Sequence, residues 1–151
     1  MTSKRYNSIP DATLAGSILL GYFLDLTLPI TEIIPSPVNL IGWVVIAAGL
    51  GFSVYTLSIL RSKHTSSDPG GVPSALITTG PFSFSRNPLY LGYVITTSGA
   101  AIIFGSLMGF TAPVICFSVI HLVIIPAEEK NLQKIFGIKY EHFKSSVRRW
   151  I

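Results

Sequence analysis

The chain has 151 residues, of which 49% are hydrophobic and only 12% are charged. A soluble domain carries roughly a quarter of its residues as charged side chains, so this composition excludes an ordinary soluble protein and predicts a membrane protein. The formal net charge of +4 does not indicate nucleic-acid binding, because the basic residues are not interleaved with aromatic side chains on which bases stack. The single cysteine, Cys116, cannot form an intramolecular disulfide and is expected to be a packing residue.

Four apolar segments follow one another along the chain, at about residues 12–30, 38–60, 88–104 and 110–126. Each is about long enough for a helix to cross a hydrocarbon core of roughly 30 Å. The fold class predicted is therefore all-α, a polytopic membrane helix bundle with about four transmembrane helices in a single domain. The first segment is read as a retained helix, because it contains Asp25 and lacks the small-residue site at which a signal peptide is cleaved.

Small and polar residues within these segments indicate how the helices pack. Gly42, Gly49 and Gly51 give the second helix small surfaces that a neighbouring helix can approach closely. The third and fourth helices are joined only by residues 105–109, so they must form an antiparallel hairpin. Asp25 and His121 are costly in lipid, and both are expected to face the bundle interior.

The basic residues orient the bundle in the membrane. All 11 lie before the first helix, between the second and third, or after the fourth. Lys and Arg are retained in short loops on the cytosolic side, so both termini are predicted to be cytosolic.

Two segments on that side are long enough to form a site. A loop at residues 61–87 is rich in Ser, Thr, Gly and Pro, and residues 127–150 have the apolar periodicity of an amphipathic helix that Gly137 bends. In this loop, His64 is interpreted as an interfacial residue, since no second metal ligand occurs at a suitable spacing. Because the third and fourth helices form a hairpin, Arg86 and the pair Glu128-Glu129 are expected to share one pocket.

Four motifs in order resemble the isoprenylcysteine carboxyl methyltransferase and phospholipid methyltransferase superfamily. The family pattern is Leu-Val-Thr-x-Gly-Pro-Tyr, then Arg-His-Pro-x-Tyr, a Glu-Glu pair, and Phe-Gly-x-x-Tyr-x-x-Tyr. The matching residues here are 76–82, 86–90, 128–129 and 136–143. Two departures from the pattern matter: Asn87 stands where many relatives have histidine, and Phe82 replaces a tyrosine.

The resemblance implies an integral membrane methyltransferase that uses S-adenosylmethionine, with S-adenosylhomocysteine as product, and a lipid or other amphipathic acceptor. Arg86 and Glu129 are the residues expected to be indispensable. In this reading Arg86 pairs with the cofactor carboxylate, the two glutamates take its amino group, and loop backbone contacts adenine. The cofactor-binding residues it implies are Ala75, Leu76, Thr78, Gly80, Pro81, Phe82, Arg86, Asn87, Pro88, Tyr90, Glu128 and Glu129.

Two other functions remain open from sequence. A sterol-reductase-like membrane reductase shares the Arg-x-Pro-x-Tyr region and the tail, but it would bind a nicotinamide cofactor. A non-enzymatic membrane adaptor or lipid-binding protein would keep the scaffold and tolerate loss of Arg86 or Glu129.

Overall fold

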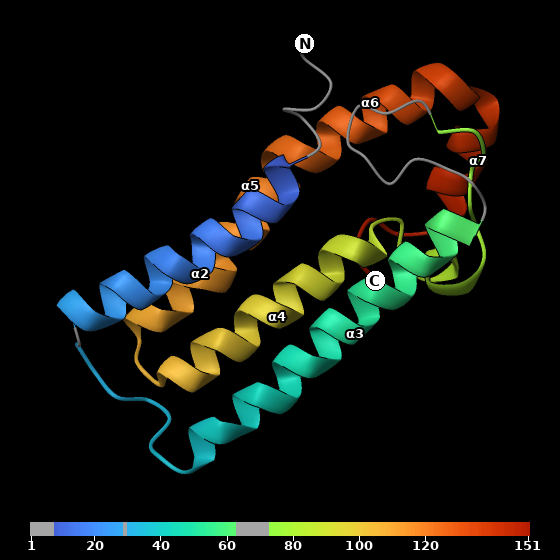
Figure 1. The fold of residues 1–151 in the computed structure, drawn as a ribbon. Coiled ribbons are helices and arrows are strands. Elements are labelled where there is room, and N and C mark those ends of the chain that lie inside the picture. Colours follow the sequence, from blue (N-terminus) through green and yellow to red (C-terminus); the bar gives the residue numbers. More distant parts are fainter. Residues whose placement is uncertain (1–7, 29, 63–72) are drawn as a thin grey trace.

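The computed structural model describes residues 8–28, 30–62 and 73–151, and every regular element in these ranges is helical. Three long helices and one shorter apolar helix run side by side as a bundle (Figure 1). The predicted all-α membrane bundle is thus confirmed. Lys4, Arg5, Lys63 and His64, on which part of the sequence analysis depends, lie outside the described residues.

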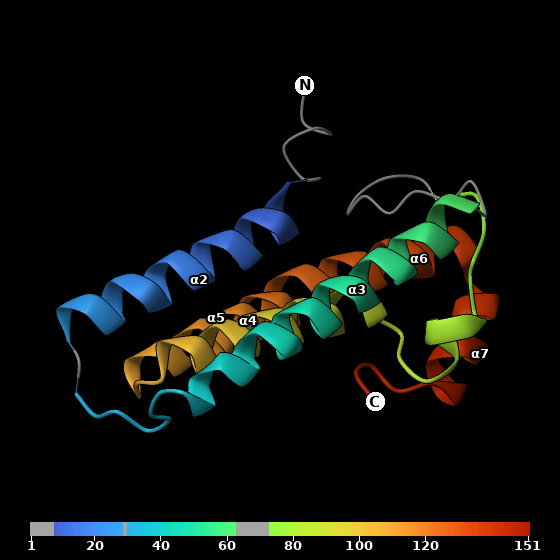
Figure 2. The same cartoon turned by 60° about the horizontal axis from the view of Figure 1, so that its bottom comes forward.

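Within the described ranges, three helices are long and apolar enough to cross a membrane. They are α2 (Ile9–Thr27), the 25 residues of Val38–Ser62, and the 29 residues of Met108–Phe136. The second of these combines a short 3-10 helix, η1 (Val38–Leu40), with α3 (Ile41–Ser62). The remaining apolar helix, α4 (Pro88–Phe104), has 17 residues and is therefore only about 25 Å long. It lies between α3 and α5 (Thr111–Val119) in the bundle (Figures 1 and 2).

Glycines allow α3 and α4 to pack with their backbones close together. A β-carbon added to Gly42 would lie 2.5 Å from the carbonyl oxygen of Gly99, and one added to Gly49 would lie 2.5 Å from Oγ1 of Thr96. Small residues at helix interfaces are how membrane helices gain van der Waals contact without a hydrophobic driving force. The prediction holds for Gly42 and Gly49, but Gly51 has no atom within 4 Å at its β-carbon position and faces away from the bundle.

The two turns at one end of the bundle are fastened to each other. Ile33 and Ile34 both donate backbone hydrogen bonds to the carbonyl of Gly105, at 2.7 and 2.9 Å, and Leu107 donates to Thr31 at 3.0 Å. Gly105 has a φ of 75°, which favours glycine, and a β-carbon there would lie 2.6 Å from the Ile34 oxygen. These contacts link the α2–α3 turn to the α4–α5 turn.

The other end of the bundle is called the basic end here. It comprises the end of α3, the segment that leads into α4, and the chain from α6 onward (Figure 1). All the described basic residues lie in these segments: Arg61, Arg86, Lys130, Lys134, Lys139, Lys144, Arg148 and Arg149.

The last transmembrane helix continues beyond the predicted boundary. α5 (Thr111–Val119) passes through a π-helical turn, η4 (Ile120–Ile124), into α6 (Ile125–Phe136) without a break. In the π turn the Ile125 N–H donates to the carbonyl of Ile120. Pro126 has no N–H and its ring crowds the carbonyl four residues earlier, so we attribute the wider turn to this proline.

The tail is divided rather than being one helix over residues 127–150. Gly137, with a φ of 53°, separates α6 from α7 (Ile138–Ser146), and Val147 is extended. Residues 147–151 then turn back toward the bundle (Figure 2). The amphipathic periodicity continued through these residues, but their contacts with the bundle, which the pattern does not encode, keep them extended.

The predicted interior residues have different surroundings. Cys116 is fully buried in the core with Tyr93 and Ile120, as expected for a packing residue. His121 is half-buried and stacks on Phe117, with ring centroids 5.3 Å apart. Asp25 is half-buried near the end of α2.

Candidate functional site

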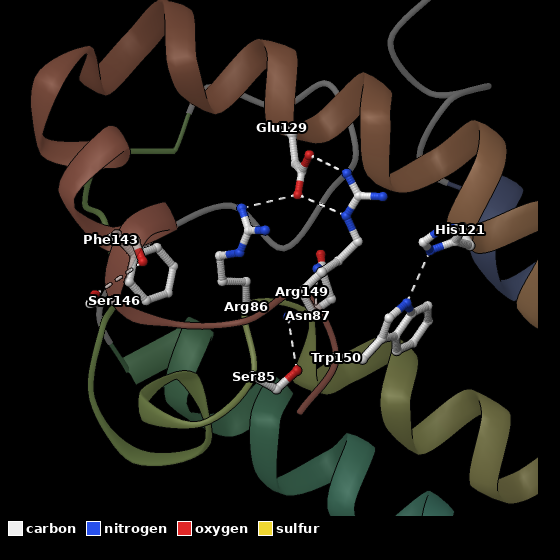
Figure 3. Close-up of polar contacts among 9 residues, drawn as sticks. All are labelled: Ser85, Arg86, Asn87, His121, Glu129, Phe143, Ser146, Arg149 and Trp150. Atoms are coloured by element: carbon white, nitrogen blue, oxygen red, sulfur yellow. Dashed lines mark hydrogen bonds and ion pairs between the residues drawn. The ribbon is translucent and has the colours of Figure 1, made fainter.

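The basic end holds a compact ionic cluster around Glu129, shown in Figure 3. Glu129 extends from α6 toward Arg86, which lies in the segment just before α4. The distance from Arg86 Nη1 to Glu129 Oε1 is 3.1 Å, and the two side chains are only 8% and 12% exposed. The structure therefore brings together the two residues that the sequence analysis expected to be indispensable.

A third member of the cluster, Arg149, was not among the predicted site residues. Its Nη2 donates to Glu129 Oε2 at 2.7 Å and its Nε donates to Oε1 at 3.1 Å. This two-point geometry matches a planar guanidinium to a planar carboxylate and fixes both. From the sequence, Arg149 is interpreted only as a charge that sets topology, because nothing in the sequence shows that the chain folds back after α7.

The chain after α7 is fastened to the segment before α4 by backbone contacts. The Arg86 N–H donates to the Arg148 carbonyl at 3.0 Å, and the Asn87 side-chain amide donates to the Arg149 carbonyl at 3.0 Å. Ser85, fully buried, accepts a 3.2 Å bond from the Asn87 N–H. Asn87 thus holds the C-terminal segment in place, a role for which an amide serves as well as an imidazole N–H.

Arg86 is not fully satisfied by these contacts. Its Nε and Nη1 are buried, and neither has a hydrogen-bond partner, although Nη1 is within ion-pair distance of Glu129. Buried guanidinium donors ordinarily bind an acceptor, since leaving them unpaired is costly. Arg86 therefore has donors available for an additional anionic or carbonyl group.

Tyr140 in α7 lies next to the cluster. Burial raises the pKa of its hydroxyl, Glu129 raises it further, and Arg86 and Arg149 oppose the change. Tyr140 is thus a neutral phenol near neutral pH, so Arg86, Arg149 and Glu129 together carry a net charge of +1.

Glu128 has a different environment from its neighbour. It accepts a short hydrogen bond from the hydroxyl of Tyr90, which lies in the first turn of α4. Tyr90 lies edge-on to Tyr93, whose hydroxyl in turn donates to Asp11 of α2. Two carboxylate and phenol pairs therefore tie α2, α4 and α6 together beside the ionic cluster.

The loop residues predicted to contact the cofactor are placed in two groups. Gly80 and Pro81 belong to a 3-10 turn, η2 (Gly80–Ser83), and a β-carbon on Gly80 would lie 3.2 Å from Ile59 of α3. Phe84 stacks on Phe52 of the same helix, so this turn packs on α3. Before it, Ala75 and Thr78 are exposed and Leu76 is half-buried, as is Phe82 within the turn. Their role in binding adenine remains a prediction.

Comparison with known proteins identifies the family. The model described as phospholipid methyltransferase matches residues 38–139. The chain belongs to the phospholipid methyltransferase family. It is similar to phosphatidylethanolamine N-methyltransferase B of Dictyostelium discoideum, at 26% identity over 115 residues that cover 71% of this chain and 58% of that protein. The chain thus spans less than two thirds of that relative, and no solved structure matches it significantly.

The phospholipid methyltransferase match includes some members of the site and not others. It covers Arg86, Glu128 and Glu129 but ends at residue 139, before Arg149 and Trp150. It also begins after α2, which contributes Asp11. The contacts made by the two ends of the chain therefore add to what family membership indicates.

Proposed function

We propose that this chain transfers a methyl group from S-adenosylmethionine to a phospholipid or similar amphipathic acceptor at the basic end of its helix bundle, on the cytosolic face of the membrane. Membership of the phospholipid methyltransferase family supports the reaction class. The basic residues gathered at this end support the orientation. The observation that carries the proposal is the cluster of Arg86, Glu129 and Arg149, in which the side chains of Arg86 and Glu129 are largely buried.

The cluster suits the amino-acid part of the cofactor. S-adenosylmethionine supplies an electrophilic methyl group on a sulfonium, next to an α-amino and an α-carboxylate group. The unpaired Nε and Nη1 of Arg86 are suited to the carboxylate, and Glu129 is suited to the amino group. The buried donors of Arg86 thus fit the group that the family implies.

Methyl transfer needs little covalent help from the protein. Holding donor and acceptor in line supplies on the order of 7 to 11 kcal/mol, so positioning in a site with little water suffices. Glu128, which accepts a hydrogen bond from Tyr90, is a second carboxylate, and we assign it to a cationic acceptor headgroup. The printed name of the similar Dictyostelium protein supports a nitrogen acceptor of the phosphatidylethanolamine type.

The test uses the full chain purified in lipid nanodiscs with radiolabelled S-adenosylmethionine. Label is expected in the lipid fraction when phosphatidylethanolamine is present, and little is expected with phosphatidylcholine or a prenylcysteine alone. No labelling of any lipid, together with no binding of S-adenosylhomocysteine by folded protein, would rule the proposal out. Tight binding of a nicotinamide cofactor instead would favour the membrane reductase.

Two variants test the assigned residues. Glu129→Gln and Arg86→Ala are expected to lower kcat/KM by about 100-fold or more, because breaking a buried charged pair costs roughly 2 to 5 kcal/mol. Matched controls are Glu32→Gln at the opposite end and Arg61→Ala at the end of α3, both exposed. If Glu129→Gln and Arg86→Ala retain activity while folded, the non-enzymatic adaptor becomes the better reading.

A further inference from the structure

We propose that Arg149 is a positioning residue for the cofactor site: by binding both oxygens of Glu129, it keeps that carboxylate from neutralising Arg86 and leaves Arg86 free to bind a ligand carboxylate. This inference rests on the proposed function. It assigns a role to a residue outside the region matched by the family model.

The geometry around Glu129 is unequal. Arg149 donates a hydrogen bond to each oxygen, at 2.7 and 3.1 Å, and the carboxylate keeps further lone pairs for a ligand amino group. Arg86 approaches only Oε1, at 3.1 Å, and Nη1 forms no hydrogen bond there. Glu129 is therefore mainly the partner of Arg149. Without Arg149, Arg86 would be its remaining guanidinium neighbour.

The charge balance supports the same role. Two guanidinium groups share one carboxylate, and Glu128 is engaged with Tyr90. The excess positive charge lies on Arg86, which is more deeply buried than Arg149, at 8% against 30% exposure. A buried, incompletely paired cation attracts an anion strongly because the local dielectric is low. Removing Arg149 would leave a neutral Arg86–Glu129 pair with little affinity for a carboxylate.

Arg149 is held in place by its neighbours in the chain. We call residues 147–151 the C-terminal clasp. The carbonyls of Arg148 and Arg149 accept bonds from Arg86 and Asn87, and Trp150 donates to His121 at 3.0 Å. Contacts on both sides of Arg149 therefore limit its motion, as positioning requires.

The experiment compares Arg149→Gln, Arg149→Lys and Arg148→Gln in the full chain in nanodiscs. Arg148 is an exposed residue of the same charge, so its variant controls for loss of charge from the clasp. Arg149→Gln is expected to raise KM for S-adenosylmethionine, and Kd for S-adenosylhomocysteine, by about tenfold or more, with kcat changed less than about threefold. Arg149→Lys keeps the charge but not the two-point geometry and is expected to fall between. Arg148→Gln should match the unmodified chain.

A double-variant cycle separates this role from general stability. In Glu129→Gln the carboxylate that Arg149 binds is absent, so Arg149 can no longer affect the pairing of Arg86. Adding Arg149→Gln to this variant should therefore change Kd for S-adenosylhomocysteine less than about threefold. A purely structural role would instead lower the active fraction and leave KM unchanged. If Arg149→Gln does not fold, Arg149→Lys with an unchanged KM overturns the inference.

The outcomes distinguish this inference from the proposed function. If the unmodified chain binds no S-adenosylhomocysteine, both the proposed function and this inference are overturned. If it binds, and Arg149→Gln binds as tightly as Arg148→Gln, only the inference is overturned.

Discussion

Trp150 donates a hydrogen bond from its indole Nε1 to Nδ1 of His121, 29 residues earlier in the chain, at 3.0 Å. Phe117 stacks on both rings, with centroids 5.3 Å from His121 and 4.9 Å from Trp150. The last residues of the chain are thereby joined to the middle of a transmembrane helix.

Trp150→Phe is expected to lower stability by about 1 kcal/mol, because the aromatic stacking is kept while one hydrogen bond is lost. Denaturant-induced unfolding in detergent micelles measures the change. Trp43→Phe is the matched control, since Trp43 is 61% exposed on the outer face of α3. Equal stability of the two variants would show that the bond to His121 contributes nothing.

Asn87→Ala is expected to weaken cofactor binding about fivefold, because it releases the Arg149 carbonyl and loses roughly 1 kcal/mol of hydrogen bonding. Asn87→His restores an N–H donor at nearly the same place and is expected to stay within about twofold of the unmodified chain. Titration with S-adenosylhomocysteine measures both. An equal effect of the two substitutions would mean that the amide does not act through the C-terminal clasp.

Tyr90→Phe is expected to destabilise the chain by about 1.5 to 3 kcal/mol, since it removes the donor to the carboxylate of Glu128. Glu128→Gln keeps an acceptor and should cost less. Unfolding of both single variants and the double variant gives the coupling between the two side chains. Additivity to within about 0.5 kcal/mol would contradict a direct interaction.

Gly49→Ala is expected to destabilise the bundle, because its new β-carbon would lie 2.5 Å from Thr96 Oγ1 and 2.7 Å from the Thr96 backbone nitrogen. α3 and α4 would have to separate. Gly51→Ala, two residues away in open space, should be neutral or stabilising by roughly 0.5 to 1 kcal/mol. Thermal unfolding of the pair tests the packing, and similar melting temperatures would count against it.

The apolar periodicity and the positions of proline and glycine predicted most of the helices of this fold. Prolines and glycines bound α4 closely, with Pro88 at its start and Gly105 after its end. The end of the last transmembrane helix was predicted too early, because a proline such as Pro126 usually marks a helix boundary. In the structure a π turn accommodates Pro126 within a continuous helix.

The site was predictable only where its residues fall in recognisable motifs. Arg86 and Glu129 were placed together because a short hairpin connection requires it. Arg149 was not, because its position depends on a chain reversal fixed by contacts of Asn87 and Trp150 that are remote in sequence. Asp11 was missed for the same reason, since its partner Tyr93 belongs to another helix.

The π turn at Ile120–Ile124 sets the angular phase of everything that follows it. One residue corresponds to about 100° of rotation around an α-helix, so the extra residue turns the rest of the helix by that amount relative to α5. In an unbroken α-helical register, Glu129 would face about a quarter of a turn away from Arg86. The π turn, which we attribute to Pro126, therefore sets which face of the helix presents the carboxylates.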